Sequence, residues 1–265
     1  MTRARTAILA GNWKMNYGPI EAKSFVKEIL PELGKVLYNS TQTLCILCPP
    51  TISLSAVRTV LGTMPTSLQN YIELGAQNMY FEEKGALTGE ISPIMVRELC
   101  TTVILGHSER RHYFGETNEF INKKTVSALQ HGLRPIVCVG ENEEQHAAGQ
   151  TEQVIRTQIQ GCLCDFPSEH LQNIVVAYEP VWAIGSGKAA TVDDAGHIAH
   201  SIRQLYHDMY NEDVATTLRV LYGGSVTSEN INEFMAHPDI DGALIGGASI
   251  KPDFVEIVRR VVENT

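Results

Sequence analysis

Short apolar runs alternate with longer mixed stretches from one end of the chain to the other. Eight of these runs predict β-strands, and they cover residues 7–10, 44–48, 72–76, 103–105, 136–139, 174–178, 218–222 and 243–245. Nearly every position in them is apolar, so both faces of each strand are expected to be buried. Such runs are typical of parallel strands that are covered by helices.

The stretches between the runs predict helices, because apolar residues recur there at intervals of three and four. The pattern is clearest at Phe25, Ile29 and Leu33, at Ala195, Ile198, Ile202, Leu205 and Met209, and at Phe254, Ile257, Val258 and Val261. Two helix starts are also indicated, by Ser92 followed by Pro93 and by Thr191 three residues before Asp194. Each helix would pack its apolar face against the strands.

Eight strand and helix pairs in one chain predict a (β/α)8 barrel, the TIM barrel fold of the α/β class. An open doubly wound sheet also alternates strands with helices, but no G-x-G-x-x-G motif follows the first strand. The 265 residues suit one barrel, and no low-complexity linker interrupts the series. We therefore expect a single domain over residues 1–265.

The charge balance argues against a nucleic-acid or membrane-surface partner. The chain has 30 acidic and 21 basic residues and a formal net charge of −9 at pH 7, which opposes binding to polyanions but permits a local positive spot for one small anion. No stretch approaches the ~18 apolar residues of a membrane span. The apolar run near the N-terminus is too short for a secretory signal, so we expect a cytoplasmic protein.

The cysteines indicate neither a disulfide framework nor a metal site. There are six of them, at Cys45, Cys48, Cys100, Cys138, Cys162 and Cys164. A chain of this length needs no disulfides, and we expect buried thiols in a reducing compartment. Cys45 and Cys48 have the spacing of a zinc ligand pair, but no second pair matches it. No metal and no cofactor are expected.

Polar residues follow five of the predicted strands. They are Asn12 and Lys14 after the first, His107, Ser108 and Glu109 after the fourth, Glu179 after the sixth, Gly223, Gly224 and Ser225 after the seventh, and Gly246 and Gly247 after the eighth. Each has an ordinary explanation alone, as a solvated cation, a paired carboxylate or a turn. A closed barrel would bring them all to one rim, where barrel active sites lie.

The glycines of this rim are suited to an anion, because backbone N–H groups without bulky side chains can surround a phosphate. Residues 180–190 form an apolar segment with a glycine-rich tip, which indicates a lid that excludes water from a site. Gly187 and Lys188 resemble the end of a P-loop. However, Trp182 stands where its first glycine is required, and Ala189 replaces the Ser or Thr that would hold magnesium.

Five longer motifs resemble the triosephosphate isomerase family and occur in family order over essentially the whole chain. They are GNWKMN at 11–16, GHSERR at 106–111, YEPVWAIG at 178–185, YGGSV at 222–226 and GGAS at 246–249. Ser186 and Ala189 depart from the family, which commonly has threonine at both positions. These two changes affect the expected hinge kinetics of the lid and leave the chemistry unchanged.

The resemblance implies an enzyme that interconverts dihydroxyacetone phosphate and D-glyceraldehyde 3-phosphate through an enediolate. Glu179 would be the base that moves a proton between neighbouring carbons. His107 would polarise the carbonyl oxygen and transfer protons between the two oxygens. A helix that begins at His107 would disfavour the imidazolium. Lys14 would supply positive charge, and Asn12 would orient the same oxygen.

The resemblance also implies how the phosphate is held. Gly185, Ser225, Gly246 and Gly247 would contact it, together with Lys14. Ser108 and Glu109 would support the site from behind, Glu109 either as the family's acidic residue behind the lysine or as an ordinary partner of a Lys or Arg.

Residues 77–90 resemble the loop through which members of the family form dimers. We expect a homodimer in which this loop, with exposed aromatic residues and a glycine turn, inserts into the partner. The alternative is an ordered surface loop.

Two other functions are weaker alternatives. A sugar-phosphate aldolase on the same fold would need a Schiff-base lysine on a barrel strand, and no predicted strand contains lysine. A phosphate-binding scaffold without catalysis would be expected to lack Glu179, His107 or Lys14, and all three are present.

Overall fold

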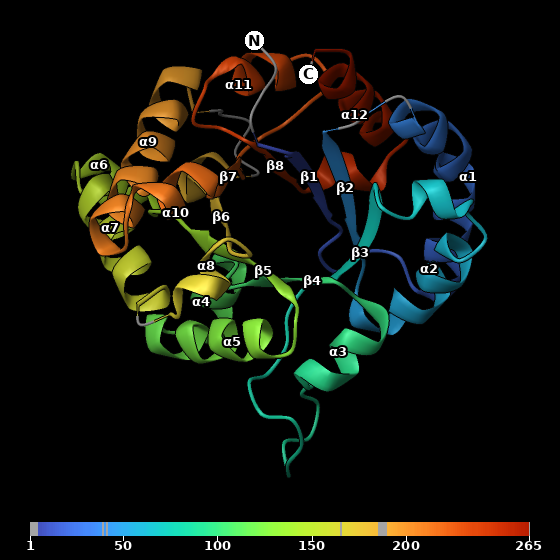
Figure 1. The fold of residues 1–265 in the computed structure, drawn as a ribbon, viewed down its shortest axis with the longest axis horizontal. Helices are drawn as coiled ribbons and strands as arrows, with labels where there is room; N and C mark the ends of the chain where they lie inside the picture. The colour runs from blue at the N-terminus through green and yellow to red at the C-terminus, as the bar shows by residue number, and fades with distance from the viewer. Residues whose placement is uncertain (1–4, 39, 41, 165, 185–189, 265) are drawn as a thin grey trace.

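The computed structural model describes residues 5–38, 40, 42–164, 166–184 and 190–264. Eight parallel strands form a closed barrel in which each strand pairs with the next in sequence and β8 returns to β1 (Figure 1). The strands are β1 (Ala7–Asn12), β2 (Thr43–Cys48), β3 (Ile72–Ala76), β4 (Thr102–Leu105), β5 (Arg134–Val139), β6 (Val175–Tyr178), β7 (Arg219–Tyr222) and β8 (Gly242–Ile245).

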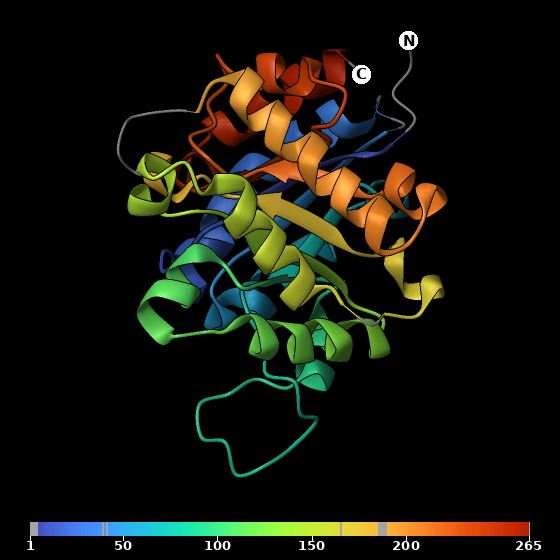
Figure 2. The same cartoon turned by 90° about the vertical axis from the view of Figure 1, so that its left-hand side faces the viewer.

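Helices surround the barrel on its outer side, as Figures 1 and 2 show from two directions. They are α1 (Pro19–Tyr38), α2 (Leu54–Leu61), α3 (Pro93–Leu99), α4 (Ser108–Phe114), α5 (Asn118–Gln130), α6 (Glu143–Ala147), α7 (Thr151–Cys162), α8 (Ser168–Leu171), α9 (Val192–Met209), α10 (Glu212–Thr217), α11 (Ile231–Ala236) and α12 (Asp253–Asn264). Short 3-10 helices occur at η1 (Thr51–Ser53), η2 (Thr66–Leu68), η3 (Val181–Ala183) and η4 (Gly247–Ile250). In the described part of the chain, no helix has the length and apolar character needed to cross a membrane.

The predicted (β/α)8 barrel is confirmed, and every predicted strand corresponds to an observed one. The largest differences lie at two strand ends. β1 extends to Asn12, because its last residues continue to pair with β2 as far as Cys48. β5 begins at Arg134 and contains Pro135, which lies opposite Val103 of β4. The predicted helix starts are also observed, with Ser92 capping α3 and Thr191 capping α9.

Alternation along the strands separates two layers of the core. The residues inside the barrel form one cluster, which includes Ile8, Ala10, Ile46, Ile136, Leu221 and Leu244. Their neighbours, such as Leu9 and Leu47, belong to the larger cluster between strands and helices. The barrel is therefore filled by side chains, as expected for eight strands, and a ligand can enter only at its mouth.

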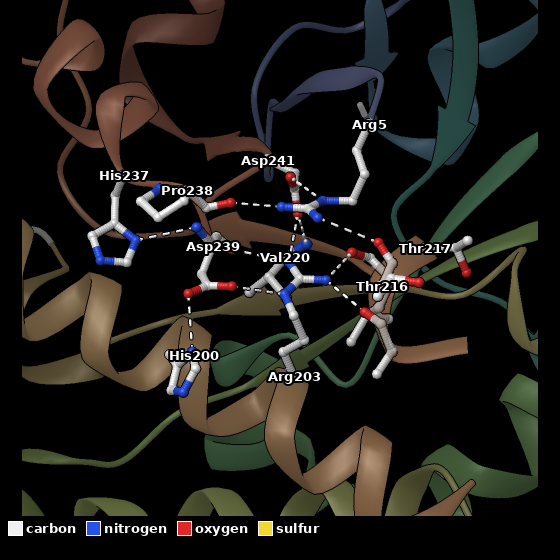
Figure 3. Close-up of polar contacts among 12 residues, drawn as sticks. Arg5, His200, Arg203, Thr216, Thr217, Val220, His237, Pro238, Asp239 and Asp241 are labelled. Carbon is white, nitrogen blue, oxygen red and sulfur yellow. Dashed lines mark hydrogen bonds and ion pairs between the residues drawn. The ribbon is translucent and has the colours of Figure 1, made fainter. Parts of the chain in front are cut away.

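A buried charge network ties the barrel together where β1, β7 and β8 begin (Figure 3). The carboxylate of Asp241 is fully buried and lies 2.7 Å from Arg5 Nε and 3.0 Å from Arg203 Nη2. It also accepts a hydrogen bond from Val220 N of β7. Arg203, on α9, extends the network to Asp239 at 2.8 Å. Each buried charge has an opposite partner, which is the condition for tolerating it.

The segment between β3 and α3 projects away from the barrel (Figures 1 and 2). The prediction that its aromatic residues are exposed is wrong. Tyr80 and Phe81 are partly buried, stacked on each other at 4.3 Å between ring centroids, and both contact Phe120 of α5. The exposed parts of the segment are residues 82–86 and 88–90. The aromatic rings thus anchor the base of the projection, because burying them against α5 removes apolar surface from water.

The last pairing of the barrel requires glycine at position 242. Gly242 pairs with Ile8 and has a φ of +152°, and an added Cβ would lie 1.9 Å from the Ile8 carbonyl oxygen. We expect Gly242→Ala to destabilise the protein by at least about 4 kcal/mol, measured as the free energy of unfolding in urea. Gly18→Ala is the matched control, because no atom lies within 4 Å of its added Cβ. Equal stability of the two variants would contradict this explanation of closure.

The reactivity of the cysteine thiols tests how the core is packed. Five of the six cysteines are buried and Cys164 is partly exposed. Burial raises the pKa of Cys100 to about 12 and the pKa values of Cys48 and Cys138 well above the usual range, so almost no reactive thiolate is present at pH 8. We expect an alkylating reagent to label only Cys164 rapidly in the folded protein and all six after unfolding, as read by peptide mass spectrometry. Rapid labelling of Cys138 would show that the core is not packed as described.

Candidate active site

A cavity of about 420 Å³ opens at the carboxyl ends of the strands. It is lined by residues that follow β1, β4, β6, β7 and β8. Among them are Asn12, Lys14, His107, Glu179, Gly223, Gly224, Ser225, Gly246 and Gly247. The lining runs from Asn12 to Asp253, so residues from both ends of the chain surround one space, as the closure of the barrel requires.

Glu179 directly follows β6 and is almost completely buried beside this cavity. Its backbone N donates to Val139 O of β5, which continues the strand pairing by one residue. Its carboxylate Oε1 lies 2.9 Å from His107 Nε2, and Oε2 accepts from Ser108 N at 3.0 Å. The carboxylate is thus held in place by two donors from the segment that follows β4.

His107 precedes helix α4 as its N-cap, where its ring Nδ1 accepts a hydrogen bond from Glu109 N at 3.2 Å. A ring nitrogen that accepts from a backbone N–H carries no proton. The hydrogen-bond network therefore assigns the proton of the neutral ring to Nε2. This nitrogen faces the Glu179 carboxylate and can donate to an oxygen in the cavity.

Burial and neighbouring charges have opposite effects on the pKa values of His107 and Glu179. Burial lowers the pKa of His107, but the Glu179 carboxylate outweighs burial and raises it above the ordinary value. Burial raises the pKa of Glu179, but His107, the Ser108 N–H and the charge of Lys14 together lower it. Glu179 is consequently ionised at neutral pH and can act as a proton acceptor.

Lys14 has an unusual backbone conformation. Its φ is +53°, in the left-handed region that costs a non-glycine residue about 1–3 kcal/mol. Two side chains hold it there: Asn12 Oδ1 accepts from Lys14 N at 3.0 Å, and Gln77 Nε2 donates to Lys14 O at 2.9 Å. Its ammonium lies 2.8 Å from Glu109 Oε1. Glu109 is therefore a partner of Lys14, and it does not line the cavity.

The two glycines after β7 leave room for neighbouring site residues. An added Cβ on Gly223 would lie 2.8 Å from Glu179 Cγ, and one on Gly224 would lie 2.2 Å from the Tyr222 hydroxyl. Ser225, Gly246 and Gly247 also line the cavity. Gly247 has no atom within 4 Å of an added Cβ, so its backbone faces open space.

One predicted site residue, Gly185, lies outside the described residues. The same holds for Ser186 and Ala189, the two positions at which the predicted lid departs from its family. The structure describes the segment as far as Ile184 and again from Ala190.

Sequence reasoning missed three residues that shape the site. Gly140, directly after β5, is required because an added Cβ would lie 1.7 Å from the Glu179 carbonyl oxygen. Gln77, directly after β3, holds the backbone of Lys14. Lys251 adds a second cation to the cavity wall. Gly140 and Gln77 share the signal that identified the other site residues, since both follow a strand.

Among the residues that the structure describes, no group of three or more His, Cys, Asp or Glu side chains is arranged to hold a metal ion.

The chain is similar to known proteins over nearly its full length. A family model described as triosephosphate isomerase matches residues 7–261. A triosephosphate isomerase of Chloroflexus aurantiacus is 46% identical over 256 residues, covering 96% of this chain and 98% of the relative. The corresponding proteins of Dictyoglomus turgidum and Dehalococcoides mccartyi are 49% and 48% identical, covering 96% and 98% of this chain and 99% of each relative. Since the family model and these relatives span nearly all of it, the chain belongs to the triosephosphate isomerase family.

Proposed function

We propose that this enzyme interconverts dihydroxyacetone phosphate and D-glyceraldehyde 3-phosphate, a step shared by glycolysis and gluconeogenesis. The observation that carries the proposal is the convergence of a buried carboxylate, an imidazole and an ammonium on one cavity, from Glu179, His107 and Lys14. These three groups supply what proton transfer next to a carbonyl requires: a base, a hydrogen-bond donor and a fixed positive charge.

Glu179 is the base in this proposal. Its carboxylate takes the proton from the carbon beside the carbonyl, so the C–H bond breaks and an O–H bond forms on the glutamate. The electron pair moves to form a carbon–carbon double bond, and the carbonyl oxygen becomes the enediolate oxygen. The hydroxyl proton on the neighbouring oxygen then moves to the enediolate oxygen by way of His107. Return of the first proton from Glu179 to the former carbonyl carbon gives the other isomer. The low pKa of Glu179 keeps the base ionised between turnovers.

His107 and Lys14 stabilise the charge that develops on oxygen. The Nε2 proton of His107 points into the site and can donate to the substrate oxygens. A carbonyl facing Nε2 in place of the carboxylate removes the main cause of the raised His107 pKa, which favours a neutral donor. The Lys14 ammonium adds a positive charge beside the same oxygens, and the φ of +53° that Asn12 and Gln77 maintain aims it there.

Backbone N–H groups hold the phosphate in this scheme. Ser225, Gly246 and Gly247 line the same cavity, and the open space at Gly247 lets an anion approach its backbone. Gly185 completes the set in the family resemblance. An aldolase mechanism has no support, because none of the eight strands that the structure describes contains lysine.

Removal of the base tests this function. We expect Glu179→Gln to lower kcat roughly 10²- to 10⁴-fold, the usual contribution of a general base, because the amide cannot accept the proton. A coupled assay with D-glyceraldehyde 3-phosphate measures it. Glu28→Gln, at an exposed position on α1, is the matched control and should retain the wild-type rate. Activity within tenfold of wild type in Glu179→Gln would reject Glu179 as the base.

We also propose that the protein is a homodimer formed through residues 77–90. A second cavity of about 790 Å³ lies beside the first and shares Asn12, Lys14 and His107 with it. Tyr113 and Phe114 line this second cavity and are exposed in the single chain. Insertion of the projecting segment of each subunit into this cavity of the other would cover both rings and give a symmetric interface.

Subunit association can be measured directly. We expect sedimentation equilibrium to give twice the 29.2 kDa chain mass, and Tyr113→Glu to raise the dissociation constant at least roughly tenfold by placing a charge in an apolar contact. Tyr38→Glu is the control, because Tyr38 is similarly exposed but lies on α1. A single-chain mass at every concentration would refute the dimer.

Two further expectations belong to this proposal. One is a single domain over residues 1–265, and the other is a cytoplasmic location, which the six thiols favour because they suit a reducing compartment.

A further inference from the structure

A histidine stacks on the turn that follows the proposed base. The ring of His146 lies flat against the indole of Trp182, with 4.2 Å between centroids and 17° between planes. His146 belongs to the short helix α6, whose start is fixed by a capping box between Asn142 and Gln145. Trp182 belongs to η3, three residues after Glu179. The helix therefore supports the outer face of this turn.

The N–H of the indole contacts a fully buried carboxylate. Glu141 Oε1 accepts from Trp182 Nε1 at 2.7 Å and from the Tyr178 hydroxyl at 3.2 Å. His146 Nδ1 approaches the same oxygen at 3.5 Å. Glu141 Oε2 has no hydrogen-bond partner among the described residues. An uncompensated buried carboxylate is costly, so the nearby imidazole is well placed to balance it.

The main-chain carbonyl of Glu141 also holds the backbone of the turn. Val181 N donates to Glu141 O at 3.1 Å, and Ala183 N donates to Pro180 O at 2.8 Å. Only Pro180 separates this turn from Glu179. The orientation of the Trp182 indole and the direction in which the chain leaves Glu179 are thus set by one group of contacts.

We propose that His146 is a positioning residue: its stacking on Trp182 and its approach to Glu141 hold the turn after Glu179 in the orientation that proton transfer needs. The inference about turnover rests on the proposed isomerase function. The inference about the indole rests on the contacts alone.

The stacking supports the indole because the two rings lie face to face, which places His146 between the turn and solvent.

Tryptophan fluorescence tests the contact without reference to catalysis. The chain has two tryptophans, and Trp13 is fully buried between Tyr17 and Phe25. An imidazole stacked on an indole changes its emission. At a fixed pH we therefore expect His146→Gln to alter the emission of the protein, because the substitution removes the ring that stacks on Trp182. The same substitution should have no effect on emission in a Trp182→Phe background.

Steady-state kinetics test the positioning role. We expect His146→Gln to lower kcat roughly two- to tenfold with little change in KM, since the loss of a contact of cation–π strength affects the turn and leaves the cavity intact. His146→Arg should restore kcat, because a planar guanidinium can stack on the indole and face the carboxylate. His207→Gln is the matched control: His207 is 46% exposed against 47% for His146 and also faces a carboxylate, but contacts no indole.

Three outcomes would contradict the proposed positioning role of His146. Unchanged emission in His146→Gln, with thermal unfolding confirming a folded protein, would show that the ring does not rest on Trp182. Altered emission with wild-type kcat would show contact without positioning, and a raised KM with unchanged kcat would assign His146 to substrate binding. Any of the three overturns the proposal. A wild-type enzyme without isomerase activity would instead refute the proposed function, and the emission data would still decide whether His146 holds the indole.

Discussion

Closure of the barrel by the pairing of β1 with β8 is the constraint on which the rest of the structure depends. The contact between Ile8 and Gly242 is close enough to exclude any side chain at position 242. Only when this pairing forms do the residues after β1 and β8 face those after β4 and β6 across one cavity. The buried carboxylate of Asp241 reinforces the same seam, by joining the segments before β1 and β8 to α9.

At the mouth of the barrel, neighbouring residues hold the charged groups of the site in position. Glu179 is buried without being neutralised, because His107 and the Ser108 N–H supply donors to its two oxygens. Lys14 occupies a strained conformation because Asn12 and Gln77 hold its backbone. Neighbouring contacts therefore compensate the cost of burial and strain at this site.

A second set of contacts, outside the cavity, holds the turn that follows Glu179. Glu141 contacts the backbone and the indole of the turn that follows Glu179, and His146 covers that indole. Glu141 therefore holds the turn in two ways, through its main-chain carbonyl to Val181 N and through its carboxylate to the indole. Support of this kind lies too far from the cavity to appear in a list of residues that touch a substrate.

The sequence by itself determined the alternation of strands and helices and the polar residues at the strand ends, since both follow from local periodicity and from the rule that parallel strands end on one side. Tertiary structure alone decided the strained backbone of Lys14, the requirement for Gly140 and the pairing of Arg203 with Asp241. It also partly buried Tyr80 and Phe81, whereas the sequence of residues 77–90 predicts that its aromatic residues are exposed. Each of these depends on contacts between residues far apart in the chain, and such contacts leave no periodic signal in a single sequence.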